Sequence, residues 1–420
     1  MARPLINISR RQALWFAGFL VMYEFLTYIA NDMIMPGMIK VVRYFNGPET
    51  AVASSLTAYM LGGASLQLFL GPISDRFGRR PVMMFGAVFF FICTVCIAIS
   101  NSMDQFIIAR FFQGMGLCFI GVIGYATLQE IFAEMDAIRL ISVMANVSIS
   151  APLLGPLLGA VFIYYFNWRM IFVIISCFAL VAVWGLWRYM PEPVGQVKRS
   201  GELIPRVSLL PNVVAQNYKR LLCNLRFLFG SIGLGFLGIP CIIWIALSPI
   251  ILISDAQLTV IQYGFWQMPV FAASIMGNWF LRYLTRKYEV SKILWIGSCI
   301  AGIGLLLTCV LPVVTQGNYL GLMPGLIMYF FGLGVSSAPL DRIILFSTNV
   351  SKGTASALMT MVAMCIQAAG IEVANIIYES HSNVRFGLYC GAAGVIYFLL
   401  IFCSLRQPTD VKSTVMVGNP

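Results

Sequence analysis

Apolar stretches of about 20 residues recur along the whole chain, and each is long enough to cross a ~30 Å hydrocarbon layer as a helix. In the first half they cover roughly 13–38, 50–71, 82–101, 103–129, 140–165 and 169–190. In the second half they cover roughly 226–253, 258–284, 292–314, 319–340, 354–378 and 384–405. The pattern predicts an all-α integral membrane protein with twelve transmembrane helices.

The composition excludes a soluble protein. Hydrophobic residues make up 60% of the chain and charged residues only 10%, whereas a soluble domain carries about 25% charged residues. A soluble enzyme and a nucleic-acid-binding protein are therefore excluded. The net charge of +11 is explained instead by where the basic residues lie.

The longest polar stretch, from Pro191 to Arg226, divides the chain into two sets of six helices. We expect two pseudo-symmetric bundles at 1–190 and 226–408, a central cytoplasmic loop at 191–225 and a tail at 409–420. Of the 27 basic residues, 22 fall on one side of this topology. The positive-inside rule then places both termini in the cytoplasm.

Weak motifs give no support to redox, metal or nucleotide chemistry. The 11 cysteines are scattered through apolar stretches, so we interpret them as packing thiols, and a single histidine cannot assemble a metal site. A C-x-x-C at Cys93 and a G-x-G-x-x-G at Gly233 both lie inside predicted membrane helices, where coincidence and close helix packing explain them better. No cofactor or metal is expected.

Three charged residues inside membrane segments point to function. Glu24, Asp32 and Arg110 would each cost roughly 2.5–3.5 kcal/mol at the bilayer centre if unpaired. Helical geometry places Tyr28, Asn31 and Asp32 within about 80° of Glu24, so the four form one polar stripe that can face a cavity.

Depth relates Asp32 to Arg110. Counting ~1.5 Å per residue, Glu24 lies near mid-membrane, and Asp32 and Arg110 both lie in its outer half, where they can interact. A static ion pair is the alternative interpretation. We expect Glu24, Asp32 and Arg110 to couple transport to protons, because a carboxyl group in a low-dielectric site can bind a proton in the physiological pH range.

The stretch Gly71–Arg80 reads GPISDRFGRR, which resembles the G-x-x-x-D-R-x-G-R-R signature of the major facilitator superfamily. We expect a tight turn on the cytoplasmic face that acts as a conformational latch, formed by Gly71, Asp75, Arg76, Gly78, Arg79 and Arg80. A basic loop that only sets topology would explain the arginines but not Asp75. A half-chain offset places 281–290 over this stretch, where Thr285 replaces Asp75, so we expect the latch to be stronger in the first half.

The stretch 151–159 reads APLLGPLLG and resembles the proline and glycine motif of drug:proton antiporters within that superfamily. Pro152, Gly155, Pro156 and Gly159 share one helical face, which permits close packing and bending. Ordinary small-residue packing is the alternative.

Helix 1, YEFLTYIANDMIMPG from Tyr23 to Gly37, and RFFQG from Arg110 are similar to the MdfA type of bacterial multidrug/proton antiporters with twelve helices. The resemblance weakens in the second half, where Asp341 and Arg342 sit in a less characteristic setting. It implies a bacterial inner-membrane protein with its proton and drug site in the N-terminal half.

Aromatic, amide and thioether side chains suit varied lipophilic compounds. We expect substrate contacts from this set: Glu24, Tyr28, Asn31, Asp32, Gln113, Met144 and Asn146. Glu130 is expected to snorkel at the cytoplasmic end. For Glu372 the sequence leaves two roles open, a second acidic site or outer-end packing.

Together these features predict export of lipophilic cationic and neutral compounds in exchange for protons by alternating access. The chain lacks a G-x-x-x-x-G-K-[ST] phosphate loop, so the proton gradient is the expected energy source. The expected partners are lipophilic drugs, protons and membrane lipid, with no nucleic acid, and the expected state is a monomer. Alternatives are a dedicated exporter of one metabolite or siderophore and a receptor without turnover. An enzyme is not expected, since no nucleophile–base or metal constellation is present.

Overall fold

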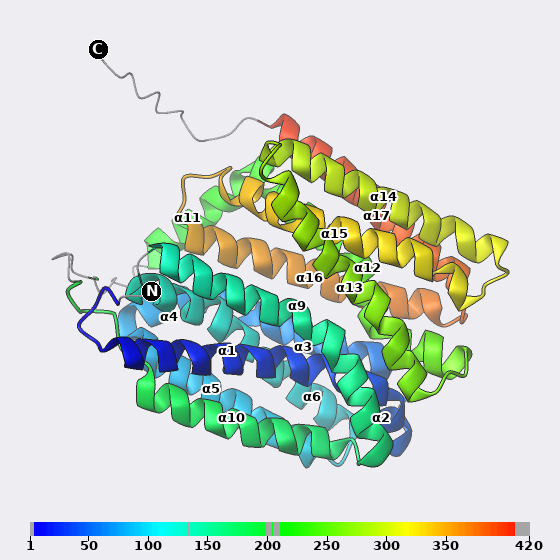
Figure 1. Cartoon of the computed structure of the whole chain (residues 1–420), viewed down its shortest axis with the longest axis horizontal. Helices are drawn as coiled ribbons and strands as arrows, with labels where there is room; N and C mark the ends of the chain where they lie inside the picture. The colour runs from blue at the N-terminus through cyan, green and yellow to red at the C-terminus, as the bar shows by residue number, and fades with distance from the viewer. Residues whose placement is uncertain (1–3, 133, 199–203, 205–210, 408–420) are drawn as a thin grey trace.

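The computed structural model describes residues 4–132, 134–198, 204 and 211–407, and nearly all of them are helical (Figure 1). The first half contains these elements: α1 (Arg10–Asp32), η1 (Met35–Gly37), α2 (Met38–Tyr44), α3 (Ala51–Ser65), α4 (Gln67–Phe77), α5 (Arg79–Ala98), α6 (Met103–Gly114), α7 (Gly116–Cys118), η2 (Phe119–Gly124), α8 (Tyr125–Ile131), α9 (Glu134–Tyr165) and α10 (Arg169–Tyr189). The second half contains these: α11 (Pro211–Cys223), α12 (Leu225–Pro249), η3 (Ile250–Asp255), α13 (Val260–Leu284), α14 (Val290–Val314), η4 (Tyr319–Gly321), α15 (Met323–Leu345), α16 (Lys352–Tyr378) and α17 (Asn383–Arg406).

The helices account for the twelve predicted membrane spans. Nine continuous helical stretches of the described chain are long and apolar enough to cross a bilayer, and α3 with α4 forms a tenth that is bent by 41°. The remaining two are α9, which carries two prolines, and α13, whose apolar run is interrupted by Gln262, Gln267 and Asn278. Within these ranges the predicted all-α architecture is confirmed.

Local capping signals explain where several helices begin. The Ser9 hydroxyl accepts from the backbone of Gln12 at 3.1 Å at the start of α1. Asn224 caps α12 in the same way, accepting from the Phe227 backbone at 2.9 Å. These short polar side chains satisfy backbone donors that have no partner inside the first helical turn.

The helices of each half pack mainly against one another, and a few helix pairs form contacts between the two halves. In Figure 1 the first-half helices α1, α5, α6 and α10 lie in the lower part of the view, and α14, α15 and α17 lie in the upper part. α1 packs on α9 and α10, and α12 packs on α16 and α17. The halves meet where α3 contacts α16 and where α9 contacts α13.

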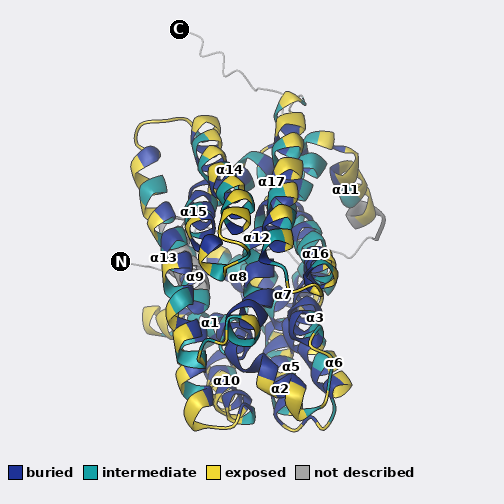
Figure 2. Ribbon diagram, turned by 90° about the vertical axis from the view of Figure 1, so that its right-hand side faces the viewer, coloured by how far each residue is buried: buried dark blue, intermediate teal, exposed yellow. Residues whose placement is uncertain are grey.

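Residues in the middle of the bundle are mostly buried, and those on its outer helices are more often exposed. Figure 2 shows exposed positions on the outer helices and buried positions where the two halves meet. Many large apolar side chains on the outer helices are exposed, among them Trp184 and Trp187 on α10 and Leu399 on α17. A soluble protein rarely presents such a surface, whereas lipid covers it without cost.

The predicted loop between residues 191 and 225 contains a helix. α11 occupies Pro211–Cys223, and the Tyr218 hydroxyl donates to the Leu68 carbonyl of α4 at 3.0 Å. Burial raises the pKa of the Tyr218 phenol, so it remains a neutral donor. Hydropathy missed α11 because the helix lacks the long apolar run of a membrane span.

The predicted glycine turn at 71–80 is also mostly helical. α4 continues through Phe77 and α5 begins at Arg79, so only Gly78 remains between them. Gly78 has φ 105° and ψ 149°, a backbone conformation that residues other than glycine rarely adopt. The flanking spans, predicted to end at 71 and to begin at 82, were too short, because Gly71 and Pro72 are accommodated inside α4 and α5 already begins at Arg79.

Candidate functional site

α1 carries two carboxyl groups on the side that faces the other helices. The exposed fractions of Glu24 and Asp32 are only 1% and 4%. Tyr28 and Asn31 lie on the same side of α1, and all four residues line one cavity. The polar stripe of this helix therefore faces the inside of the protein and not lipid.

The cavity has a volume of about 960 Å³ and is bounded by both halves of the chain. Its walls come from α1, α3, α4, α5, α7, η2, α8 and α9 in the first half and from α11, α12, α15 and α16 in the second half. Aromatic, thioether and aliphatic side chains are prominent in these walls, including Tyr59, Met60, Tyr125, Ile245, Met359 and Met364. Large, mostly apolar walls with a few polar groups are typical of sites for lipophilic ligands.

The cavity extends from the α1 acids to the end of the bundle where Asp75, Arg79 and Lys352 lie, which we call the basic end. At the opposite end, the two halves are in contact. The Asn375 amide of α16 donates to the Thr50 carbonyl at 3.1 Å. A ligand therefore reaches the α1 acids from the basic end.

Further contacts close that opposite end. Ser54 of α3 donates to Glu372 Oε2 of α16 at 3.4 Å. The His381 ring lies 2.8 Å from Asp255 and 3.9 Å from Glu49, which belongs to the other half. Glu372 thus lies in the outer-end contact, the second of the two roles that the sequence left open.

Glu24 is held by a tyrosine that sequence reasoning missed. The Tyr125 hydroxyl, at the start of α8, donates to Glu24 Oε1 at 2.8 Å. Tyr125 lines the cavity beside Glu24. A phenol gives the carboxylate one fixed donor without a compensating positive charge.

Arg110 does not form the direct ion pair with Asp32 that helix depth suggested. Its Nη2 donates to Asn31 Oδ1 at 2.5 Å, and Asn31 Nδ2 donates to Asp32 Oδ1 at 3.1 Å. Arg110 is fully buried, and its guanidinium lies 4.5 Å from the centre of the Tyr59 ring. The amide of Asn31 occupies the space between the two charges, which helix depth alone did not reveal.

Gln113 lies in the packed core and not on the cavity wall. Arg110 Nη1 donates to Gln113 Oε1 at 2.7 Å, and Gln113 Nε2 donates to Thr94 at 2.9 Å. The expected substrate contact from Gln113 is therefore replaced by a supporting one. The reason is that Arg110 and Gln113 lie one turn apart on α6 and satisfy each other.

The two predicted substrate residues on α9 have different outcomes. Met144 is fully buried, and the described cavity lining does not include it. The side chain of Asn146 lies outside the described part of the structure. No structural support for a drug contact therefore comes from either residue.

The proline and glycine motif of α9 packs on the end of α1. A Cβ atom added at Gly155 would lie 2.6 Å from the Cβ of Asp32, and one at Gly159 would collide with the Met33 carbonyl. Pro152 lines the main cavity. Pro156 and Asp32 both line a second, small pocket, to which Pro152 also contributes. The motif thus supports the backbone that carries the Asp32 carboxylate.

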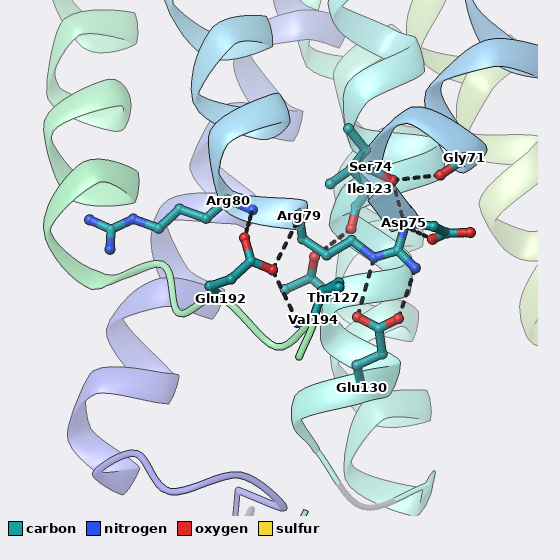
Figure 3. Close-up of polar contacts among 10 residues, drawn as sticks. All are labelled: Gly71, Ser74, Asp75, Arg79, Arg80, Ile123, Thr127, Glu130, Glu192 and Val194. Atoms are coloured by element: carbon teal, nitrogen blue, oxygen red, sulfur yellow. Dashed lines mark hydrogen bonds and ion pairs between the residues drawn. The ribbon is translucent and has the colours of Figure 1, made fainter. Parts of the chain in front are cut away.

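At the basic end, Arg79 joins two carboxylates (Figure 3). Its Nη1 lies 2.5 Å from Asp75 Oδ1, and its Nη2 lies 2.8 Å from Glu130 Oε1. Arg79 Nη1 also donates to Ser74 Oγ at 2.5 Å. All these partners belong to the first half of the chain, so the cluster stabilises α4, α5 and α8 relative to one another.

Glu130 therefore does not snorkel toward water as expected, because the charge of Arg79 holds it.

The Glu192 carboxylate, after α10, accepts from the backbone N–H groups of Arg79 and Arg80 at 3.0 and 2.9 Å. This interaction caps the N-terminus of α5. Arg76 takes no part in the cluster, since its side chain is exposed and lies over Phe77.

Sequence reasoning also missed Asp341 in the second half. The apolar run was expected to end at residue 340, which placed Asp341 outside the membrane helix, but α15 continues to Leu345. Asp341 lines the same cavity as Glu24 and Asp32. The sequence signal that could have indicated Asp341 is the pair Asp341-Arg342, which directly follows the apolar run 319–340.

Comparison with known proteins gives relatives over nearly the full chain. The multidrug transporter MdfA of Yersinia pestis bv. Antiqua (strain Angola) is 42% identical over 98% of both chains. The multidrug transporter MdfA of Escherichia coli O157:H7 is also 42% identical, over 94% of this chain and 95% of the relative.

Solved structures support the fold. A D-xylose-proton symporter has a TM-score of 0.73 at 18% identity, covering 94% of this chain and 98% of the symporter. A bacterial homologue of the lysosomal transporter Spinster, in an inward-facing and unoccupied conformation, has a TM-score of 0.72 at 13% identity, covering 95% of this chain and 99% of that one. The sequence profile of the Major Facilitator Superfamily matches residues 20–411, and this chain belongs to that family.

Proposed function

We propose that this protein is a proton-coupled multidrug antiporter that exports lipophilic cationic and neutral compounds by alternating access. The observation that carries the proposal is the placement of Glu24 and Asp32 in a large, mostly apolar cavity that reaches the basic end. The relationship to MdfA multidrug transporters supports it. The energy source is the proton gradient, and no cofactor takes part.

The chemistry of exchange follows from the cost of a buried negative charge. A carboxylate removed from water requires a compensating positive charge or a proton. A cationic compound entering the cavity meets that requirement, so its binding releases a proton from Glu24 or Asp32. A neutral compound can be exchanged by favouring one access state over the other.

Arg110 and the amide of Asn31 hold Asp32 in a defined position for this exchange. Gain or loss of charge on Asp32 changes the hydrogen bond with Asn31 and, through it, the environment of Arg110. Pro152, Gly155, Pro156 and Gly159 allow α9 to lie against this part of α1. We assign the role of changing access to this contact and to the Asp75–Arg79–Glu130 cluster.

The structure corresponds to the state whose cavity is reached from the basic end. By the positive-inside rule this end, with both termini, faces the cytoplasm of a bacterial inner membrane. The six-helix bundles at 1–190 and 226–408 move relative to each other in the proposed cycle. The molecule acts as a monomer, since one chain contains the whole cavity.

Ethidium efflux in energised inverted vesicles tests the proposal. Wild type should transport ethidium in a protonophore-sensitive way, and Glu24→Gln, Asp32→Asn and Arg110→Ala should each lower the rate by about ten-fold or more. Asp104→Asn, which changes an exposed acid, is the matched control and should transport normally. Absence of ethidium transport by well-expressed wild type would instead favour a dedicated exporter of one compound.

A further inference from the structure

The proposed function leaves one acidic group of the described cavity lining without a role, namely Asp341 on α15. Its Oδ1 atom is buried and accepts no hydrogen bond from any residue that the structure describes. We propose that Asp341 forms a second anionic subsite, which binds the distal positive charge of a lipophilic dication whose other charge lies at Glu24. This inference rests on the proposed function and narrows its substrate class.

The nearby cations are engaged elsewhere, so the charge of Asp341 is available to a ligand. Lys352 donates to the carbonyls of Leu345 and Thr348 at 2.7 and 3.1 Å, which ties its ammonium to the end of α15. Arg342 lies over the Phe346 ring at 5.0 Å. Among the described ion pairs, none includes Asp341.

Arg79 is also unavailable to Asp341, although it lines the same cavity. Its guanidinium is already bound by Asp75 and Glu130. None of these described cations at the basic end therefore forms an ion pair with the Asp341 carboxylate. A cationic group entering from the cytoplasm is the partner that the cavity lacks.

A purely structural role does not account for Asp341. A packing carboxyl group in a protein interior forms hydrogen bonds in either protonation state, because an unsatisfied buried polar group is costly. The buried Oδ1 atom of Asp341 accepts none from the described residues, although Asp341 lines a cavity large enough for a ligand. The walls of this cavity also contain the apolar residues Leu345, Met359 and Ile245, which suits a hydrocarbon linker between two charges.

The depths of the acids set the length of the ligand. Glu24 lies about 21 Å along α1 from its first residue, Arg10, at the basic end. Asp341 lies about 6 Å from Leu345, where α15 ends on the same side. Glu24 is therefore about 15 Å further from the start of α1 than Asp341 is from the end of α15, which favours an elongated dication over a compact one.

Equilibrium binding of two quaternary ammonium ions to the purified full-length protein tests the subsite. Decamethonium carries two fixed charges joined by a decamethylene chain, and decyltrimethylammonium has a similar chain with one charge. Asp341→Asn should weaken decamethonium binding by about ten-fold and change decyltrimethylammonium binding by less than about two-fold. Asp341→Glu, which keeps a carboxylate at this position, should retain decamethonium binding. The affinity for the shorter dication hexamethonium should be unchanged in both variants.

The possible outcomes separate this inference from the proposed function. Equal weakening of both decyl compounds in Asp341→Asn overturns the subsite, because the change then acts on the monocation site as well. No weakening of either compound also overturns the subsite and leaves the monocation site intact. Failure of wild type to bind decyltrimethylammonium and ethidium overturns the proposed function together with the subsite. Normal decyltrimethylammonium affinity in Asp341→Asn shows that the variant is folded, so loss of decamethonium binding alone supports the subsite.

Discussion

Arg110 reaches Asp32 through a single intervening side chain, the amide of Asn31. The guanidinium Nη2 lies 2.5 Å from Asn31 Oδ1, and Asn31 Nδ2 lies 3.1 Å from Asp32 Oδ1. An amide is suited to this position because it offers an acceptor to the cation and a donor to the carboxylate. The positive charge of Arg110 thereby supports Asp32 through the amide of Asn31, without a direct ion pair between the two residues.

Replacing Asn31 by Leu should disrupt this connection. Arg110 and Asp32 would each lose a buried hydrogen bond, at a cost of about 1–3 kcal/mol of stability. We expect a lower unfolding temperature in detergent and slower ethidium efflux. Asn318→Ala changes an exposed helix-capping amide at the opposite end and serves as the control. Wild-type efflux by Asn31→Leu would contradict a role for the bridge.

Gly155→Ala should displace Asp32. The added Cβ would lie 2.6 Å from the Asp32 Cβ, so α1 or α9 must move, at a cost of about 1–3 kcal/mol. Efflux and thermal stability should both fall. The matched control is Gly18→Ala on α1, where an added Cβ meets nothing within 4 Å and alanine favours the helix. Equal behaviour of the two variants would show that the α1–α9 contact tolerates separation.

Arg79→Ala should be more damaging than removal of either carboxylate partner. It leaves Asp75 and Glu130 close together without their cation, and it should destabilise the protein by about 1–3 kcal/mol, since both carboxylates are partly exposed. Glu130→Gln keeps the Arg79–Asp75 pair and should have a smaller effect. Thermal unfolding of the two variants and of the exposed-site control Arg76→Ala measures the order. A larger loss from Arg76→Ala would refute the assigned roles.

Loosening the opposite end should shift the access equilibrium. The double change Glu49→Gln and Asn375→Ala removes two contacts between the halves, and we expect the population open at that end to rise about five-fold. Spin labels at the exposed positions Asn46 and Ser380, in a background without the 11 native cysteines, report the separation by pulsed electron paramagnetic resonance. Asp104→Asn at the same end is the control. An unchanged distance distribution would rule out these contacts as a closure.

The membrane architecture could be predicted because its signals are local. Each span is an apolar run of the length that a bilayer requires, and the basic residues cluster in alternate connections. Amphipathic and polar helical segments were not visible to hydropathy, so α11 was missed and the spans predicted to end at 71 and to begin at 82 left out the helical residues on both sides of Gly78. The predicted run 319–340 ended just before Asp341, whereas α15 continues to Leu345, and this difference concealed the location of Asp341 inside α15.

The identity of the charged residues was also readable from the chain, because an ionisable group inside a membrane helix is costly and therefore informative. Glu24 and Asp32 were found in this way, and their common face on α1 followed from helical geometry. Their partners could not be found, since Tyr125 is distant in sequence and carries no charge to mark it. Gln113 was assigned to the cavity because helical spacing does not say what lies opposite a side chain.

The sequence by itself predicted twelve membrane helices, an orientation from the distribution of basic residues, and the acids Glu24 and Asp32 inside a membrane helix, because these predictions depend on local hydropathy and on the energy of burying charge. Tertiary structure alone decided that Asn31 lies between Arg110 and Asp32, that Arg79 holds Glu130, and that Asp341 shares a cavity with acids from the other half. Each of these relations joins residues from different helices. Their distances follow from how the helices pack and not from the spacing of residues along the chain.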